Sequence, residues 1–331
     1  LFEYRQRFVD IILAQFEFEC PEPAVPVPAT LVNGTLTLIN EIEGNPVTDR
    51  PHNHRVERGA DNPDAPPEKD PWVADPQGPK VRVKLGDHRQ LFNYENVAAI
   101  EGSGTSHNER YLIGEGFDNI DIDLSTSDGR DTINVASGRN VTIASGNDDD
   151  TIEVSATVTG GVSVSGGGGQ DNITIDTPED VSLASYTSMT LNGGEDDDRI
   201  SGSAKADTIR GGGGRDRIFG LGGDDTIYGH DTATGGDSED KDKLDGGEGS
   251  DIIYGGGGDD QIRGGPGNDE IHGGSGEPAL GDGHKLIDTD NGQAFGAGQA
   301  DCVNALPGAS RFDTAGFGDD LGHLEHTVNK L

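Results

Sequence analysis

The sequence predicts an all-β fold, a parallel β-solenoid in which a degenerate β-helix runs into a more regular roll. Residues 193–276 repeat the pattern Gly-Gly-x-Gly-x-Asp-x-U-x every nine residues, where U is apolar. Residues 118–192 contain short runs in which two apolar residues lie two positions apart. A short fixed period is typical of stacked repeats, and apolar residues two apart face the same side of a strand. We therefore expect a chain wound into coils.

The composition is unusual for a folded protein. The chain has 331 residues, of which 53 are glycine and 31% are apolar, and its formal net charge is −37. Such a chain normally buries too little apolar surface to offset its conformational entropy. A thin continuous core, or cations that neutralise the carboxylates, would allow it to fold. The acidic excess also excludes nucleic acid as an expected partner, because phosphate backbones require basic surfaces.

The runs in residues 118–192 alternate with turns of one kind. Every second run follows an acidic or glycine-rich turn, and these turns close on Asp131, Asp150 and Asp171, which are 19 and 21 residues apart. This spacing predicts about two strands per coil of a parallel solenoid. An antiparallel sandwich is the alternative for this segment.

The nonapeptide block keeps two positions without exception. An interruption at 229–236 separates four units from four more. The sixth position of the units is Asp198, Asp207, Asp216, Asp225, Asp242, Asp251, Asp260 and Asp269. The eighth is Ile200, Ile209, Ile218, Ile227, Leu244, Ile253, Ile262 and Ile271. Two units complete one turn of the roll, so Asp198 should stack over Asp216, Asp207 over Asp225, Asp242 over Asp260, and Asp251 over Asp269.

This chemistry is suited to calcium. Glycine permits backbone conformations with φ > 0 that turn carbonyl oxygens toward one point, and aspartate adds an anionic oxygen. Besides the eight aspartates, the expected ligands are carbonyls of Gly211, Gly213, Gly246, Gly255, Gly257, Gly264 and Gly267, and position 248 is excluded because it is Glu248. Four sites between stacked loops follow, with weaker sites across the interruption and at Asp131, Asp150 and Asp171. The alternative is a flexible glycine-rich tract without metal.

The block resembles the calcium-binding β-roll of the repeats-in-toxin family, also called haemolysin-type calcium-binding repeats. The resemblance covers residues 193–276 well and residues 126–192 in degenerate form. It implies a protein secreted from a bacterium, typically through a type I exporter, that folds when it meets calcium outside the cell. The unit at Gly202 departs from the family pattern, with Ser203, Ala204 and Lys205 where glycines are usual, and a cation there disfavours calcium.

The ends of the chain carry less information. We expect an irregular N-terminal region over 1–117, with proline-rich loop or disordered segments, and a tail or cap over 277–331. The apolar segment Phe8–Phe16 is too short to span a bilayer, so no transmembrane segment is expected. Cys20 and Cys302 are favoured as free thiols over one long-range disulfide.

The leading functional prediction is a secreted or cell-surface protein that folds on binding several calcium ions and has a structural or adhesive role. Surface polysaccharides and matrix proteins are its candidate partners. The alternative is a carbohydrate-active β-helix enzyme, a lyase or epimerase, using acidic turns such as Asp148-Asp149-Asp150. A third option is a fragment whose catalytic domain lies elsewhere. The protease motif His-Glu-x-x-His and the lipase motif Gly-x-Ser-x-Gly are both missing, and His52, His54, His323 and His326 are favoured as solvated.

Overall fold

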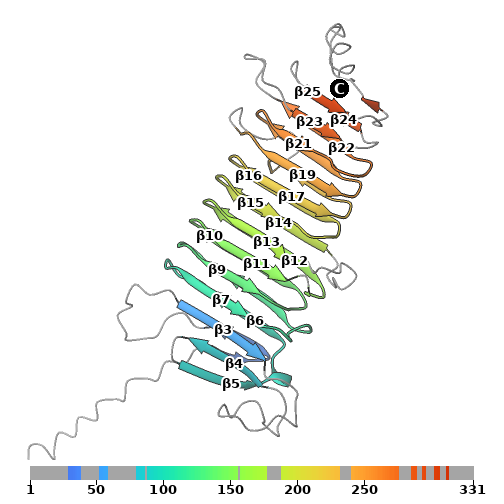
Figure 1. Ribbon diagram of the computed structural model, residues 1–331. Coiled ribbons are helices and arrows are strands. Elements are labelled where there is room, and N and C mark those ends of the chain that lie inside the picture. The colour runs from blue at the N-terminus through green and yellow to red at the C-terminus, as the bar shows by residue number, and fades with distance from the viewer. Residues whose placement is uncertain are drawn as a thin grey trace, which may run out of the picture.

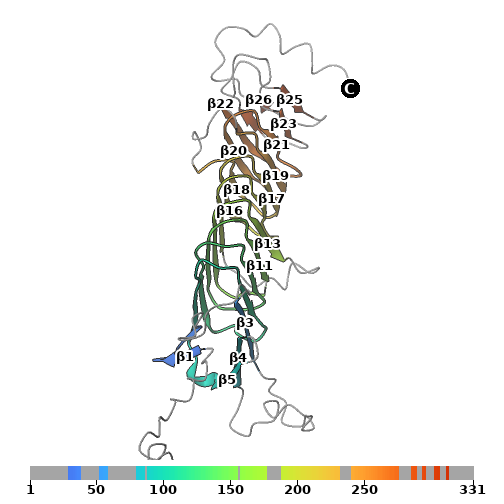
Figure 2. The same cartoon turned by 90° about the vertical axis from the view of Figure 1, so that its left-hand side faces the viewer.

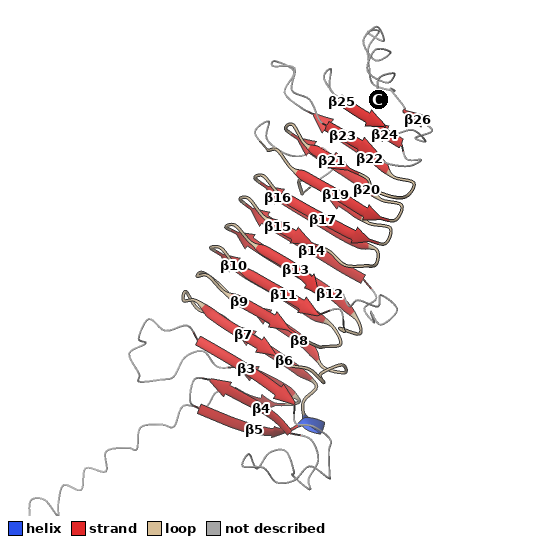
Figure 3. Ribbon diagram, viewed as in Figure 1, coloured by secondary structure: helices blue, strands red, loops and turns tan. Residues whose placement is uncertain are grey.

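The fold is a long two-sided stack of strands, shown in Figure 1. The structure, a computed structural model, describes residues 29–38, 52–58, 80–85, 88–155, 157–176, 188–231, 240–275, 285–288, 293–295, 302–305 and 311–312. In these residues the secondary structure is β, apart from one 3-10 turn, η1 (Tyr94–Asn96), as Figure 3 shows by colour. The strands form two sheets of 13 strands each. The predicted all-β parallel solenoid is confirmed.

The strands of each sheet follow one another along the stack. The first sheet consists, in spatial order, of β1 (Ala29–Val32), β2 (Thr35–Leu38), β6 (Ala99–Ser103), β8 (Asp121–Ser125), β10 (Val141–Asn147), β12 (Gly161–Gly168), β14 (Ser188–Glu195), β16 (Asp207–Gly213), β18 (Thr226–Tyr228), β20 (Ile252–Gly257), β22 (Glu270–Ser275), β24 (Gln293–Phe295) and β26 (Arg311–Phe312). The second consists of β5 (His88–Asn93), β4 (Lys80–Leu85), β3 (His52–Arg58), β7 (Glu109–Ile113), β9 (Thr132–Val135), β11 (Thr151–Ser155), β13 (Asn172–Asp176), β15 (Arg199–Ser201), β17 (Arg217–Gly222), β19 (Lys243–Glu248), β21 (Gln261–Arg263), β23 (Lys285–Asp288) and β25 (Cys302–Ala305).

From β6 onward, successive strands belong alternately to the two sheets, so each coil contributes one strand to each. Strands two apart in sequence pair in parallel, as β10 with β12 and β11 with β13. The antiparallel sandwich considered for residues 118–192 is therefore wrong. Figure 2, turned by 90°, shows the two sheets from the edge, with turns that join them facing the viewer. We call one strand from each sheet, with its turns, a rung.

The core between the sheets is thick in the N-terminal rungs and thin in the nonapeptide rungs. Each strand from β8 to β13 buries two apolar side chains, as β12 buries Val162 and Val164. Each strand from β15 to β22 buries one apolar residue from the eighth repeat position, and all eight of these are exposed by 2% or less. The register explains part of the difference, because Met189 of β14 pairs with Asp207 of β16, and Leu191 pairs with Ile209. An apolar column is thus continued by an acidic one.

Ordered strands are present within residues 1–117, the region that the sequence predicts to be irregular. The strands β2, β3, β6 and β7 pair in parallel with one another or with later rungs in the same two sheets. The end of the stack is finished by antiparallel partners, β1 on β2 and the meander β3–β4–β5. His54, expected in a solvated loop, is buried and its ring stacks on Tyr111 at 5.1 Å between centroids. The sequence hides these strands because long proline-rich insertions separate them.

At the other end, strands continue into residues 277–331. The backbone of β23 pairs with β21, and that of β24 with β22, so the predicted tail carries further rungs. Phe8–Phe16, Cys20, His323 and His326 lie outside the described residues. Within the part of the chain that the structure describes, no helix has the length and apolarity needed to cross a membrane.

Candidate metal centre

The aspartates of the sixth repeat position form two columns. One column follows the turns that lead from the first sheet into the second, and the other follows the turns that lead back. In each column, Oδ1 of one aspartate accepts a hydrogen bond from the backbone N–H of the aspartate one rung before it. Asp198 N–H donates to Asp216 at 2.9 Å, and Asp207 N–H donates to Asp225 at 2.9 Å. The same contact joins Asp242 to Asp260 and Asp251 to Asp269, each at 3.0 Å. All four stacked pairs predicted from the 18-residue spacing are adjacent.

The second carboxylate oxygen of several column aspartates is buried and accepts no hydrogen bond. The eight aspartates are exposed by 3% or less. In the described residues, no hydrogen bond reaches the buried Oδ2 atoms of Asp131, Asp150, Asp171, Asp198, Asp216, Asp225 and Asp251. Burying a carboxylate oxygen without a hydrogen-bond donor costs folding free energy. A bound cation or proton at each of these atoms would offset that cost.

Backbone oxygens lie close to these carboxylates. A Cβ placed on Gly193 would come within 2.2 Å of Asp198 Oδ2 and within 2.6 Å of the Gly211 carbonyl oxygen of the next rung. The same arrangement holds at Gly211, where a Cβ would come within 2.1 Å of Asp216 Oδ2 and 2.3 Å of the Gly229 carbonyl oxygen. The first glycine of the unit therefore leaves space where a carboxylate oxygen and a carbonyl oxygen from two successive loops meet, and this holds at Gly193, Gly211, Gly220, Gly246 and Gly255. Anionic and carbonyl oxygens together are the ligand set that calcium takes.

The loop backbone adopts left-handed conformations at two fixed positions. In the unit that begins at Gly211, Gly212 has φ +118° and Gly214 has φ +111°. The equivalent positions in the first unit are Gly194 at φ +124° and Asp196 at φ +76°, as the left-handed tolerance of aspartate allows. The positive φ values turn peptide groups so that the loops nest on one another.

Comparison with known protein families gives one match. A family described as the RTX calcium-binding nonapeptide repeat (4 copies) matches residues 192–227 and 242–277. These segments are RTX calcium-binding repeats. Comparisons of the chain with curated proteins and with solved structures gave no significant match.

One of the two columns extends beyond the RTX match toward the N-terminus. Glu109 N–H donates to Asp131 at 2.6 Å, Asp131 to Asp150 at 2.7 Å, Asp150 to Asp171 at 2.9 Å, and Asp171 to Asp198 at 2.8 Å. The turns share the left-handed positions of an RTX loop, with φ +110° at Gly129, +101° at Gly146 and +115° at Gly167. The weaker candidates Asp131, Asp150 and Asp171 thus lie in the same column as the repeat aspartates.

The interruption between the two RTX segments leaves both columns continuous. Asp216 N–H donates to Asp242 at 2.9 Å, and Asp225 N–H donates to Asp251 at 2.9 Å, each pair being 26 residues apart. Gly229, assigned to the interruption from sequence, holds the first-glycine position, since a Cβ on it would come within 2.3 Å of Asp242 Oδ2. Sequence spacing missed this because the inserted residues lie between the glycine and its aspartate.

The RTX unit at Gly202 differs from the others. The backbone N–H of Ser203 donates to Asp207 Oδ2 at 2.7 Å, and the Ser203 hydroxyl lies 2.8 Å from the same oxygen. Residues 203–206 also have no left-handed backbone position. The Asp207 carboxylate is therefore satisfied by its own turn, consistent with the departure noted at Ser203, Ala204 and Lys205.

The acidic turn considered for an enzyme belongs to the same framework. Asp148 Oδ2 accepts from the Gly129 N–H at 3.0 Å, and Asp149 forms an ion pair with Arg130 at 2.7 Å. Asp150 lies in the buried column. In the described residues, no group of three or more His, Cys, Asp or Glu side chains is arranged to hold a metal ion, so loop carbonyls must contribute to any RTX site.

Burial raises the pKa values of the column aspartates. The pKa values of Asp198, Asp216, Asp225 and Asp242 are raised to about 8. Desolvation is the main cause and repulsion from neighbouring aspartates adds to it, whereas the backbone N–H donors act in the opposite direction. Desolvation likewise raises the pKa of Asp150 and Asp171 to about 7, and that of Asp131, Asp207 and Asp251 to about 6. Without a cation, Asp198, Asp216, Asp225 and Asp242 therefore hold protons in the folded chain at neutral pH.

Calcium binding at neutral pH is expected to release protons. The ordinary aspartate pKa is 3.8 and the folded value of four column members is about 8, so the metal-free folded chain binds more protons than the unfolded chain between these limits. Its free energy of unfolding consequently falls as pH rises through this window. In a chelator, circular dichroism should show more β-structure at about pH 5 than at about pH 9. Calorimetric calcium titrations in buffers of different ionisation enthalpy should differ, and identical enthalpies would contradict the prediction.

Proposed function

We propose that this chain is an extracellular, calcium-held scaffold whose RTX rungs fold when they bind several calcium ions, and whose role is structural or adhesive. The observation that carries the proposal is the continuous column of buried aspartates, each with one oxygen bonded to the neighbouring rung and many with the other oxygen lacking a donor. Calcium bound to these oxygens and to loop carbonyls would tie each rung to the next.

The thin core supports a structural role for the ion. A rung such as β10 with β11 buries four apolar side chains, whereas β16 with β17 buries two. Full burial of an aliphatic side chain contributes about 1.5–3 kcal/mol, so an RTX rung lacks roughly 3–6 kcal/mol of stabilisation that the earlier rungs have. Calcium binding, as folding free energy, can replace it.

Calcium chemistry and the repeat type both support an extracellular location. Extracellular calcium modules bind the ion with Kd values of about 0.1–1 mM, so they are filled outside cells and empty inside them. RTX repeats are typical of secreted bacterial proteins. A scaffold that is extended only in high calcium would be exported unfolded and would stiffen at its destination.

A calcium titration of the whole chain tests the proposal. Isothermal titration calorimetry should show several sites filled cooperatively, and circular dichroism recorded in parallel should show a coil-to-β change. Binding of magnesium with the same stoichiometry and structural change would remove the calcium assignment. A lack of calcium binding at millimolar concentration would overturn the proposal.

A pair of adjacent aspartates provides a matched variant and control. Asp198→Asn removes a buried carboxylate charge from the column, and we expect it to lower the apparent calcium affinity of the neighbouring sites about tenfold or more. Asp197→Asn removes the same charge one residue earlier in the same loop, but this side chain is partly exposed and pairs with Arg215 at 2.6 Å. The control should bind calcium nearly as the parent does. Equal losses from both variants would show that only bulk charge matters.

A further inference from the structure

The outer face of the second sheet carries a row of three cations on neighbouring strands. Arg199 pairs in register with Arg217, and Arg217 with Lys243, on three successive rungs. All three side chains are exposed. Paired strands lie about 4.8 Å apart, and like charges directly opposite one another destabilise a sheet. In a chain of net charge −37, three adjacent cations represent a local conflict that the fold does not require.

Two other cations on the same rungs are neutralised by carboxylates. Arg215 pairs with Asp197 at 2.6 Å and Lys241 with Asp259 at 3.0 Å. In contrast, Arg217 and Lys243 have no carboxylate partner in the described part of the chain, although each lies only two residues from one of the paired cations. Arg217 and Lys243 are therefore available to an external anion.

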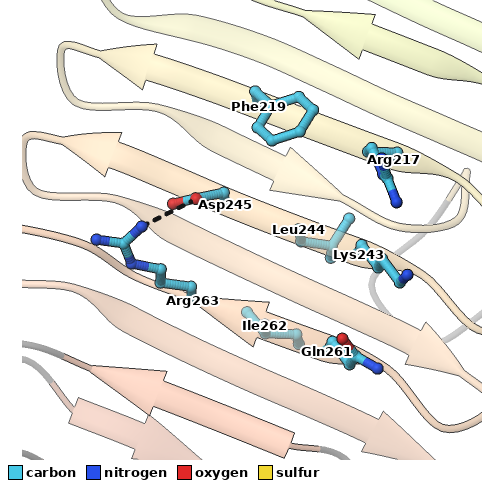
Figure 4. A pocket seen from close by; sticks show the side chains of 8 residues that line it. All are labelled: Arg217, Phe219, Lys243, Leu244, Asp245, Gln261, Ile262 and Arg263. Atoms are coloured by element: carbon cyan, nitrogen blue, oxygen red, sulfur yellow. Dashed lines mark hydrogen bonds and ion pairs between the residues drawn. The ribbon is translucent and has the colours of Figure 1, made fainter.

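The row borders a shallow groove of about 280 Å³, drawn in Figure 4. Its exposed and half-buried lining is Arg217, Phe219, Lys243, Asp245, Gln261 and Arg263. The one acidic side chain, Asp245, is paired with Arg263 at 3.3 Å, so the groove keeps a positive balance. The ring of Phe219 offers an apolar surface beside the cations, and the guanidinium of Arg199 lies 5.0 Å from its centroid.

We propose that this groove binds a linear anionic polysaccharide of the polyuronate type, lying along the stack and across the strands. Its carboxylates would face Arg217 and Lys243, a ring would pack on Phe219, and the Gln261 amide would contact hydroxyl groups. A regular charged chain matches a row of cations repeated at the rung spacing, and the aromatic side chain favours a sugar over a flexible acidic peptide. The site rests on the proposed calcium-held fold, because only stacked rungs align the row.

The test measures binding of a hexameric oligogalacturonate to the whole chain in saturating calcium, with circular dichroism recorded on every sample. A neutral hexaglucan and a hexaglutamate serve as comparison ligands. The uronate should bind best, and its affinity should fall as salt is raised. The double variant Arg217→Gln with Lys243→Gln should lose about tenfold or more in affinity. Phe219→Ala should lose affinity for the uronate while keeping the salt dependence.

The matched control is Arg215→Gln with Lys241→Gln, which changes the net charge equally on the same rungs. It should bind the uronate as the parent does. Equal losses in both double variants, or no binding by a chain whose dichroism shows the calcium-loaded β-form, would overturn the groove. Tighter binding of hexaglutamate would overturn the glycan assignment. A chain that stays unfolded in calcium would instead refute the proposed calcium-held fold.

Discussion

Removal of calcium is expected to unfold residues 193–231 and 240–275 and to leave the rungs between residues 99 and 176 folded. The RTX rungs have half the buried apolar residues of the earlier rungs, and they carry two columns of buried aspartates instead of one. Without the ion, the thin core must support carboxylates that desolvation and mutual repulsion oppose. Repeat arrays can lose part of their structure while neighbouring repeats remain folded.

Hydrogen–deuterium exchange of the whole chain, with and without a chelator, measures this division directly. The amides of β16 to β22 should lose protection by orders of magnitude in the chelator, and those of β8 to β11 should change little. Restoring calcium should restore protection, which distinguishes reversible unfolding from aggregation. Uniform protection along the whole stack in the chelator would contradict the prediction.

Gly212→Ala is expected to destabilise the calcium-bound roll by about 2–4 kcal/mol. Gly212 has φ +118°, and a Cβ on it would lie 1.8 Å from the Gly194 carbonyl oxygen of the preceding rung. The left-handed conformation is unfavourable for alanine, and the contact can be relieved only by separating two backbone loops. The calcium concentration at half-folding should rise, and the thermal transition in calcium should move to lower temperature.

The neighbouring Gly213→Ala is the control. Its backbone has no positive φ, and the atom closest to an added Cβ is Glu195 Oε2 at 3.0 Å, the far end of a flexible side chain. We expect a change below about 0.5 kcal/mol, because that carboxylate can move into solvent. Similar effects of the two alanines would show that the nesting of the loops does not depend on the left-handed glycine.

The repeat pattern by itself determined the core and most of the candidate metal centre. A nine-residue period with aspartate and an apolar residue at fixed positions specifies which side chains point inward. The stacking of Asp198 on Asp216 and of Asp251 on Asp269 followed from counting two units per coil, because local spacing fixes local geometry. The departure at Ser203 was likewise visible from residue type alone.

Only the tertiary structure decided the relations that depend on distant segments. The column of aspartates continues across the interruption, where Asp216 contacts Asp242, because strands β17 and β19 pair in register despite the inserted residues. The tertiary structure also placed β2 and β3 in the sheets with β6 and β7, across insertions that erase any period from the sequence. The row of Arg199, Arg217 and Lys243 arises for the same reason, since residues 18 and 26 apart become neighbours only when the rungs stack. The spacing within a repeat depends only on residues close in sequence, so it can be inferred from the sequence. Which rungs become neighbours depends on the register of the whole stack, which only the tertiary structure shows.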